Sequence, residues 1–197
     1  MLWALGAYIS ADVFTAHFHW LEDTHEVRPL SLLCGDREHH MEPLLMTCNS
    51  AGTNVLSTVP FALPFFGYAP WARSAWVLCF ACCCLIANWL HKMAHVLRPP
   101  WWYRAMCATG LYHTHAQHAL HHRHQCKHRS AYKRPHNSTC CYGVMCPLTN
   151  TVLDRVGYWR ALERALLLGT GLRPRVRGDR EVHRDGLAKN ELVAKQK

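Results

Sequence analysis

The sequence predicts an all-α protein, an integral-membrane helical bundle with about three spanning helices and further helices at the membrane interface. Half of its 197 residues are apolar and only 18% are charged. Three mostly apolar runs, at 2–18, 55–71 and 74–90, are each close to the roughly 17–25 residues that a spanning helix needs. The 16 histidines gather mainly in short clusters between residues 17 and 136. Because clustered imidazoles favour transition metals, a His-rich site for two metal ions is expected on one membrane face.

The first run, residues 2–18, is interrupted by Asp12 and His17. The second and third runs are separated by Arg73, so they are expected to form a helical hairpin with a tight turn. Pro60 and Pro64 should bend its first arm, because proline removes a backbone donor from a helix. A soluble protein with both runs in its core is the alternative interpretation.

The rest of the chain is more polar. Residues 99–112 begin P-P-W-W-Y-R and predict an amphipathic helix at the interface. Residues 123–137 are basic and are expected to be a loop, and residues 151–168 have the apolar spacing of one amphipathic helix. We therefore expect one membrane-embedded domain over residues 1–172 and a basic, disordered tail over residues 173–197.

The net charge of +9 is concentrated in residues 98–134 and 155–184. Next to apolar spans, such segments are typical of an anionic membrane surface or of the cytosolic side, so no nucleic-acid partner is expected. The 11 cysteines do not predict a disulfide framework, since Cys82, Cys83 and Cys84 are adjacent within an apolar run. Cys79 and Cys82 form one C-x-x-C without a second pair, which argues against a zinc ribbon.

Four histidine clusters have spacings that suit metal binding. They are H-F-H-W at 17–20, R-E-H-H at 37–40, H-K-M-A-H at 91–95 and Q-H-A-L-H-H at 117–122. On a helix, residues three or four apart share a face, so the third and fourth clusters should each direct two or three imidazoles to one side.

The predicted hairpin lies between the second and third clusters, so all four return to the same side of the membrane. The clusters hold nine imidazoles, and the eight that remain without His17 are too many for one zinc ion and suit two metal ions with positions left open for oxygen. A basic, pH-sensitive surface patch is the alternative.

Longer motifs give these clusters a context. They are D-x6-H-W-x-x-D-T from Asp12 to Thr24, R-E-H-H-x-x-P from Arg37 to Pro43, H-K-x-x-H from His91 to His95, Q-H-A-x-H-H-R from Gln117 to Arg123, P-H-N at 135–137, N-x-V-L-D from Asn150 to Asp154 and G-x-R-P-R from Gly171 to Arg175. Together they resemble the Kua-type lipid desaturase family. That family includes animal plasmanylethanolamine desaturase and the plant plastid desaturase that acts on palmitate of phosphatidylglycerol.

The resemblance implies two Fe ions held by histidine, with O2 as co-substrate. The ligands implied are His19, His39, His40, His91, His95, His118, His121 and His122, with His136 as a ninth candidate. Three acidic residues are candidates to accept hydrogen bonds from imidazole N–H groups, and so to orient the ligands without binding the metal themselves: Asp12, Asp23 and Glu38. Alternatively, they cap helices or place charge at helix ends. The motifs leave out His113, His115, His124 and His128, which are not expected to be ligands.

The same resemblance predicts an enzyme that inserts a double bond near the headgroup end of a membrane phospholipid. The first expectation is plasmanylethanolamine converted to its vinyl ether, and the second is trans desaturation of palmitate on plastid phosphatidylglycerol. A lipid hydroxylase and a non-catalytic membrane localisation domain are the alternatives. No dinucleotide motif is present, so electrons are expected from a b-type cytochrome at the endoplasmic reticulum, the first-choice location, or from ferredoxin in a plastid.

Overall fold

The computed structural model describes residues 2–25, 45–127 and 140–172, and the regular elements in these ranges are all helices. They are α1 (Leu2–Thr24), α4 (Leu45–Cys48), α5 (Ala51–Ala72), α6 (Ala75–His95), α7 (Trp101–Ala108), α8 (His115–Lys127), α9 (Pro147–Arg155) and α10 (Tyr158–Thr170). The all-α prediction is confirmed for these residues.

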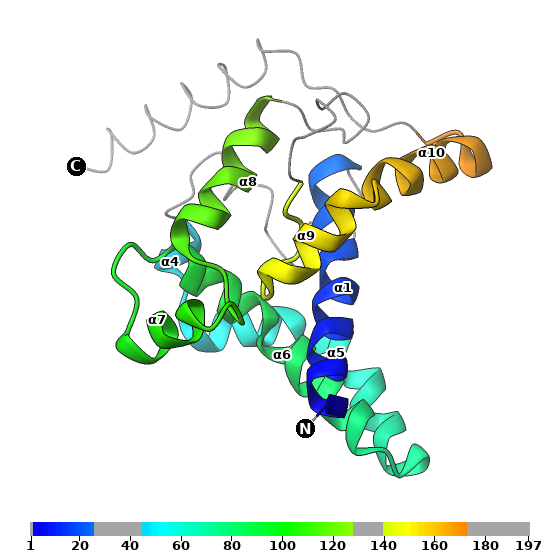
Figure 1. Cartoon of the computed structure of the whole chain (residues 1–197). Coiled ribbons are helices and arrows are strands. Elements are labelled where there is room, and N and C mark those ends of the chain that lie inside the picture. The colour runs from blue at the N-terminus through cyan, green and yellow to red at the C-terminus, as the bar shows by residue number, and fades with distance from the viewer. Residues whose placement is uncertain (1, 26–44, 128–139, 173–197) are drawn as a thin grey trace, which may run out of the picture.

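The central unit is the predicted hairpin of α5 and α6, with α1 packed across it (Figure 1). Arg73 makes the turn in the left-handed conformation, and the Ser74 side chain then caps α6 by accepting the N–H of Val77. The α5 helix continues through Pro60, Pro64 and Pro70.

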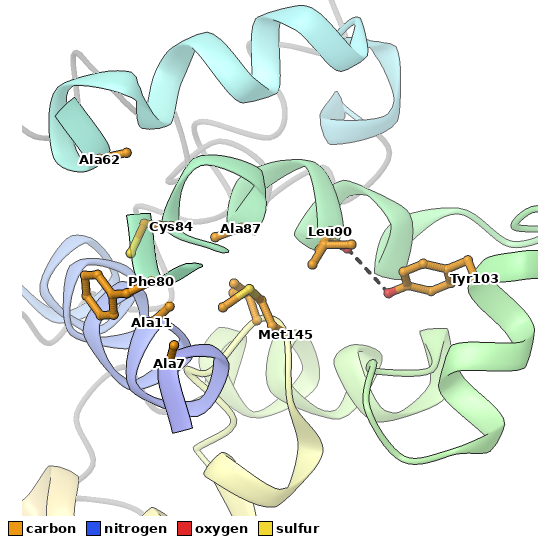
Figure 2. Close-up of a cluster of buried hydrophobic side chains, with 10 residues drawn as sticks. Ala7, Ala11, Ala62, Phe80, Cys84, Ala87, Leu90, Tyr103 and Met145 are labelled. Carbon is orange, nitrogen blue, oxygen red and sulfur yellow. Dashed lines mark hydrogen bonds between the residues drawn. The ribbon is translucent and has the colours of Figure 1, made fainter. Parts of the chain in front are cut away.

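Small side chains let the three long helices approach closely. Ala7 and Ala11 of α1, Ala62 of α5 and Ala87 of α6 are almost fully buried in one apolar cluster (Figure 2). Close approach through alanine and glycine is how helices pack in a membrane, where water does not drive them together.

One helix in the described part of the chain, α6, is both long and apolar enough to cross a membrane by length and composition. The other two predicted spans are helices of suitable length, 23 residues for α1 and 22 for α5. Polar residues such as Asp12 and His19 lower the mean hydropathy of α1, and the prolines of α5 do the same.

The shorter helices follow the hairpin. The α7 helix occupies 101–108, within the segment predicted to be interfacial. The α8 helix begins with a reciprocal capping box, in which Gln117 N–H donates to Thr114 Oγ1 and Thr114 N–H donates to Gln117 Oε1. This gives Gln117 a structural role in the Q-H-A-x-H-H-R motif. Helix α8 continues to Lys127, so the loop predicted from residue 123 is wrong for its first five residues.

The single helix predicted over 151–168 is also wrong. The structure has two helices, which meet at Val156 and Gly157. Gly157 has a φ of 67°, a left-handed conformation that glycine adopts without a Cβ penalty. The apolar spacing continues across the break, which is why periodicity alone did not reveal it. Beyond the break, α10 extends away from the bundle (Figure 1).

Candidate metal centre

The buried faces of α1 and α6 continue into the candidate site. On α6, Cys84 and Ala87 pack in the core, and His91 and His95 follow on the same face at helical spacing. On α1, His19 and Asp23 are likewise four residues apart and buried. The packing that holds the helices together thus also fixes the direction of these side chains.

Helix α8 contributes the remaining imidazoles. His118, His121 and His122 are buried. The first turn of α8 is tied to the end of α6, since His115 Nδ1 lies 3.0 Å from the carbonyl oxygen of Ala94. The structure therefore brings together the third and fourth histidine clusters with His19 of the first.

One group consists of four buried histidines, His91, His95, His118 and His122. The Nε2 atom of His118 lies 3.0 Å from that of His91, 2.9 Å from that of His95 and 3.0 Å from that of His122. The Nε2 atoms of His91 and His95 are 3.3 Å apart. Four ring nitrogens from two helices thus converge on one point.

These contacts cannot all be hydrogen bonds, because one ring nitrogen carries either one proton or one lone pair. A shared cation accounts for them better. Donor atoms about 2.1 Å from one ion are about 3.0–3.4 Å apart when the angle at the ion is about 90–110°. Burial is the main cause, and the neighbouring imidazoles the second, of a pKa of His118 well below its usual 6.5. The ring is therefore neutral, and its lone pair is available for a metal.

The second group joins His19, His121 and Asp23. The Asp23 Oδ2 atom lies 3.4 Å from the Nε2 atoms of both histidines. Their Nδ1 atoms point away from the carboxylate to backbone carbonyls: His19 Nδ1 to Tyr142 at 3.0 Å and His121 Nδ1 to Cys140 at 2.7 Å. A carbonyl can only accept, so each Nδ1 carries a proton, and in the neutral ring each Nε2 then presents a lone pair.

The two groups are neighbours. The rings of His19 and His91 have centroids 5.0 Å apart, and the rings of His118 and His121 are stacked with centroids 5.6 Å apart. Each of these pairs takes one histidine from each group. The arrangement thus offers two adjacent sites rather than one enlarged site.

The carbonyls that orient His19 and His121 belong to a segment without regular secondary structure, residues 140–146, which we call the strap. Three side chains hold the strap. Asp12 accepts the N–H groups of Met145 at 2.9 Å and Cys146 at 3.0 Å, and Asp154 accepts the N–H of Cys140 at 2.8 Å.

Asn150 is the third side chain that holds the strap. Its Oδ1 accepts the N–H of Gly143 at 2.7 Å, and its Nδ2 donates to the carbonyl of Gly143 at 2.8 Å. The same Nδ2 lies 3.0 Å from His113 Nε2, and burial lowers the pKa of His113 to about 4, so this imidazole is the neutral acceptor. Every hydrogen-bonding atom of the buried Asn150 amide is therefore used.

Sequence reasoning did not foresee the strap. The hydrogen bonds of Asp12 run to backbone N–H groups of the strap, and Asp12 reaches the imidazoles only through that backbone. The motif N-x-V-L-D, whose first and last residues are Asn150 and Asp154, was a signal for it. His113, which the motifs left out, proves to be a buried part of the same network.

A partly open cavity lies beside the two groups, with an empty volume of about 490 Å³ when the solvent-open space at its mouth is included. It lies between α1, α5 and α6, and its lining is mostly apolar, with Phe18, Phe61, Cys84 and Ala87 among the residues. His19 and His91, one from each group, also line it. The cavity therefore reaches both groups.

Several predicted site residues are outside the part of the chain that the structure describes. They are Glu38, His39, His40 and His136. The described donors nevertheless fit two transition-metal ions, because neutral imidazole and carboxylate are both ligands that iron accepts.

In the part of the chain that the structure describes, the fold and the site thus define a helical protein with two adjacent, buried groups of histidines, one of which includes a carboxylate, suited to metal ions. The comparisons with known proteins give this class a name. Residues 8–177 match the lipid desaturase domain, so the chain belongs to that family, and the resemblance predicted from the motifs is confirmed.

Two relatives match at low identity. A probable fatty acid desaturase of Acanthamoeba polyphaga mimivirus is 22% identical over 184 residues, which cover 86% of this chain and 84% of the relative. The chloroplastic fatty acid desaturase 4-like 2 of Arabidopsis thaliana is 27% identical over 185 residues, which cover 86% of this chain and 61% of that protein. No solved structure matches the chain.

Proposed function

We propose that this chain is a membrane lipid desaturase, which uses a histidine-held di-iron centre and O2 to introduce a double bond near the headgroup end of a phospholipid chain. The observation that carries this proposal is the apolar cavity against both metal-binding groups. Membership of the lipid desaturase domain family supports the reaction class.

Iron bound there would supply the oxidising chemistry that no side chain can perform on an alkyl C–H bond. O2 takes two hydrogen atoms from neighbouring carbons, and two electrons and two protons from outside, which leaves one double bond and two water molecules. The chain's own part is to hold the alkyl segment, to exclude water with apolar side chains and to fix the imidazoles through the strap. The two electrons come, in this proposal, from a b-type cytochrome or ferredoxin.

We place α1, α5 and α6 across the membrane. With 21–23 residues each, they are about 32–35 Å long, enough for a hydrocarbon core of about 30 Å. His19 and Asp23 are near the end of α1, and His91 and His95 are at the end of α6. The metal-binding groups thus lie at one face of the bilayer and not at its centre.

This position supports reaction close to the headgroup. The cavity extends from His91 to Cys84, seven positions or about 10 Å along α6. A lipid whose headgroup stays at the surface would place its first carbons beside the imidazoles and its tail toward the membrane centre.

The first substrate that we propose is plasmanylethanolamine, converted to the vinyl ether plasmenylethanolamine in the endoplasmic reticulum. The second is palmitate on phosphatidylglycerol in a plastid membrane, which the chloroplastic fatty acid desaturase among the relatives favours. The R-E-H-H motif supports the first and the Q-H-A-x-H-H-R motif the second.

Expression in cells that lack vinyl-ether lipids tests this proposal. Acid treatment of lipid extracts should release aldehydes if the first substrate is right, and a new double bond near the carboxyl end of phosphatidylglycerol palmitate would support the second. His121→Ala should abolish either product while the protein still inserts into membranes. Double bonds found only in mid-chain, only on free or thioester-linked fatty acids, or hydroxylated products alone, would refute the proposal.

A further inference from the structure

The Asp23 carboxylate occupies an unusual place between two imidazoles. Its Oδ2 atom is 3.4 Å from His19 Nε2 and 3.4 Å from His121 Nε2, and all three side chains are at most 3% exposed. The ring centroids of the two histidines are 4.7 Å apart. Two helices, α1 and α8, thus place an oxygen and two nitrogens around one buried point.

The protons on these rings are already assigned by the strap. Each Nδ1 donates to a carbonyl, from His19 to Tyr142 and from His121 to Cys140. A neutral ring then has only a lone pair at Nε2. Two nitrogen lone pairs and a carboxylate oxygen would face one another in a buried site, which is unfavourable unless a cation lies between them.

The distances agree with a shared cation. At 3.4 Å the contacts are longer than the roughly 2.7–3.2 Å of a good N–H···O hydrogen bond. They equal the separation of two donors about 2.1 Å from one ion at an angle of about 108°.

We propose that Asp23 is a direct carboxylate ligand of one of the two metal ions, together with His19 and His121. This inference rests on the proposed di-metal function and changes the role expected for Asp23, which was either to orient an imidazole or to cap or charge a helix end. Among the described residues, the two ions then have unequal surroundings, one with four imidazoles and one with two imidazoles and a carboxylate. The anionic oxygen makes the second site the better one for a harder, more highly charged ion.

Metal content and Mössbauer spectra of purified protein loaded with ⁵⁷Fe test this assignment without any substrate. The wild type should bind about two irons per chain, with two quadrupole doublets of equal area and different isomer shifts. Asp23→Asn should bind about one iron at saturating metal and lose one doublet. Asp23→Glu, which restores a carboxylate, should recover the second iron.

His122→Ala is the complementary variant, because His122 belongs only to the four-histidine group. It should lose the doublet that Asp23→Asn keeps, and the double variant should lose both. Gel filtration of each variant checks that the protein is folded.

Two results would overturn the assignment. Asp23→Asn that keeps both irons and both doublets would show an orienting role or an ion pair with protonated histidines. Loss of both ions in Asp23→Asn and in Asp23→Glu would show a structural role. Stoichiometric zinc in the wild type would defeat the di-iron function, but the ligand role of Asp23 would still be read from the loss of one zinc in Asp23→Asn.

Discussion

Gly143 lies at the point where the strap is most tightly held. A Cβ atom built there would be 2.9 Å from Asp12 Oδ2 and 3.0 Å from Asn150 Oδ1. Ordinary contacts of a Cβ atom begin near 3.4 Å. A Gly143→Ala variant must therefore move the strap by several tenths of an ångström or break a hydrogen bond made by one of these two side chains.

The expected cost follows from this overlap. Inserting a methyl group into a packed site costs about 1–3 kcal/mol. For a chain of this length, each kcal/mol lowers the melting temperature by about 2–4 °C, so we expect a fall of about 2–12 °C. The strap carbonyls orient His19 and His121, so metal affinity should also fall, by about 10–100-fold as for other changes to groups that support metal ligands.

Gly169→Ala is the matched control. Gly169 lies within α10, and nothing is within 4 Å of a Cβ built there. Alanine in a helix interior is favoured over glycine by about 0.5–1 kcal/mol, so this variant should be unchanged or slightly more stable. The assay is thermal unfolding in detergent, with metal titration alongside. Equal melting temperatures and equal metal affinity for the two variants would refute the view that the strap is held tightly at Gly143.

Three further predictions concern the network, the metal and the cavity. Asn150→Asp keeps the side-chain volume but removes both Nδ2 donations, and each lost partner costs about 1–3 kcal/mol. This variant should therefore have a lower melting temperature and a weaker metal affinity. The control, Thr151→Ala at an exposed position, should change neither quantity. Removing metal with a chelator should speed amide hydrogen exchange in α8 and the strap, because a metal ion at a free concentration of 100 times its Kd stabilises a protein by about 2.7 kcal/mol. Unchanged exchange rates would mean that the two groups do not bind metal. Thr15→Phe, at a half-buried position that also lines the cavity, should fill the cavity and lower turnover by about 100-fold with metal content intact. The exposed Ala75→Phe should not lower turnover, and equal turnover of the two variants would place the substrate elsewhere.

Some features could be predicted from the sequence because they depend on local helix geometry. The spacing of His91 and His95, and that of His118 and His122, fixes a shared face wherever the helix lies. Arg73 between two apolar runs likewise identified the hairpin. The two wrong predictions, a single helix over 151–168 and a loop from residue 123, also have local causes. The helix break at Gly157 lies inside a continuous apolar pattern, and the helical residues 123–127 are too basic to show an apolar helical pattern.

The sequence by itself determined the helical class, the histidine clusters and the family to which they belong. Only the tertiary structure decided which histidines share a site, since that depends on how α1, α6 and α8 pack across distant parts of the chain. It also revealed the strap, because the oxygens that orient His19 and His121 are backbone carbonyls, which every residue type possesses. The place of Asp23 between two imidazoles was decided in the same way. Its spacing to His19 is local, but its approach to His121 exists only once α8 has packed against α6 and its side chains meet those of α1.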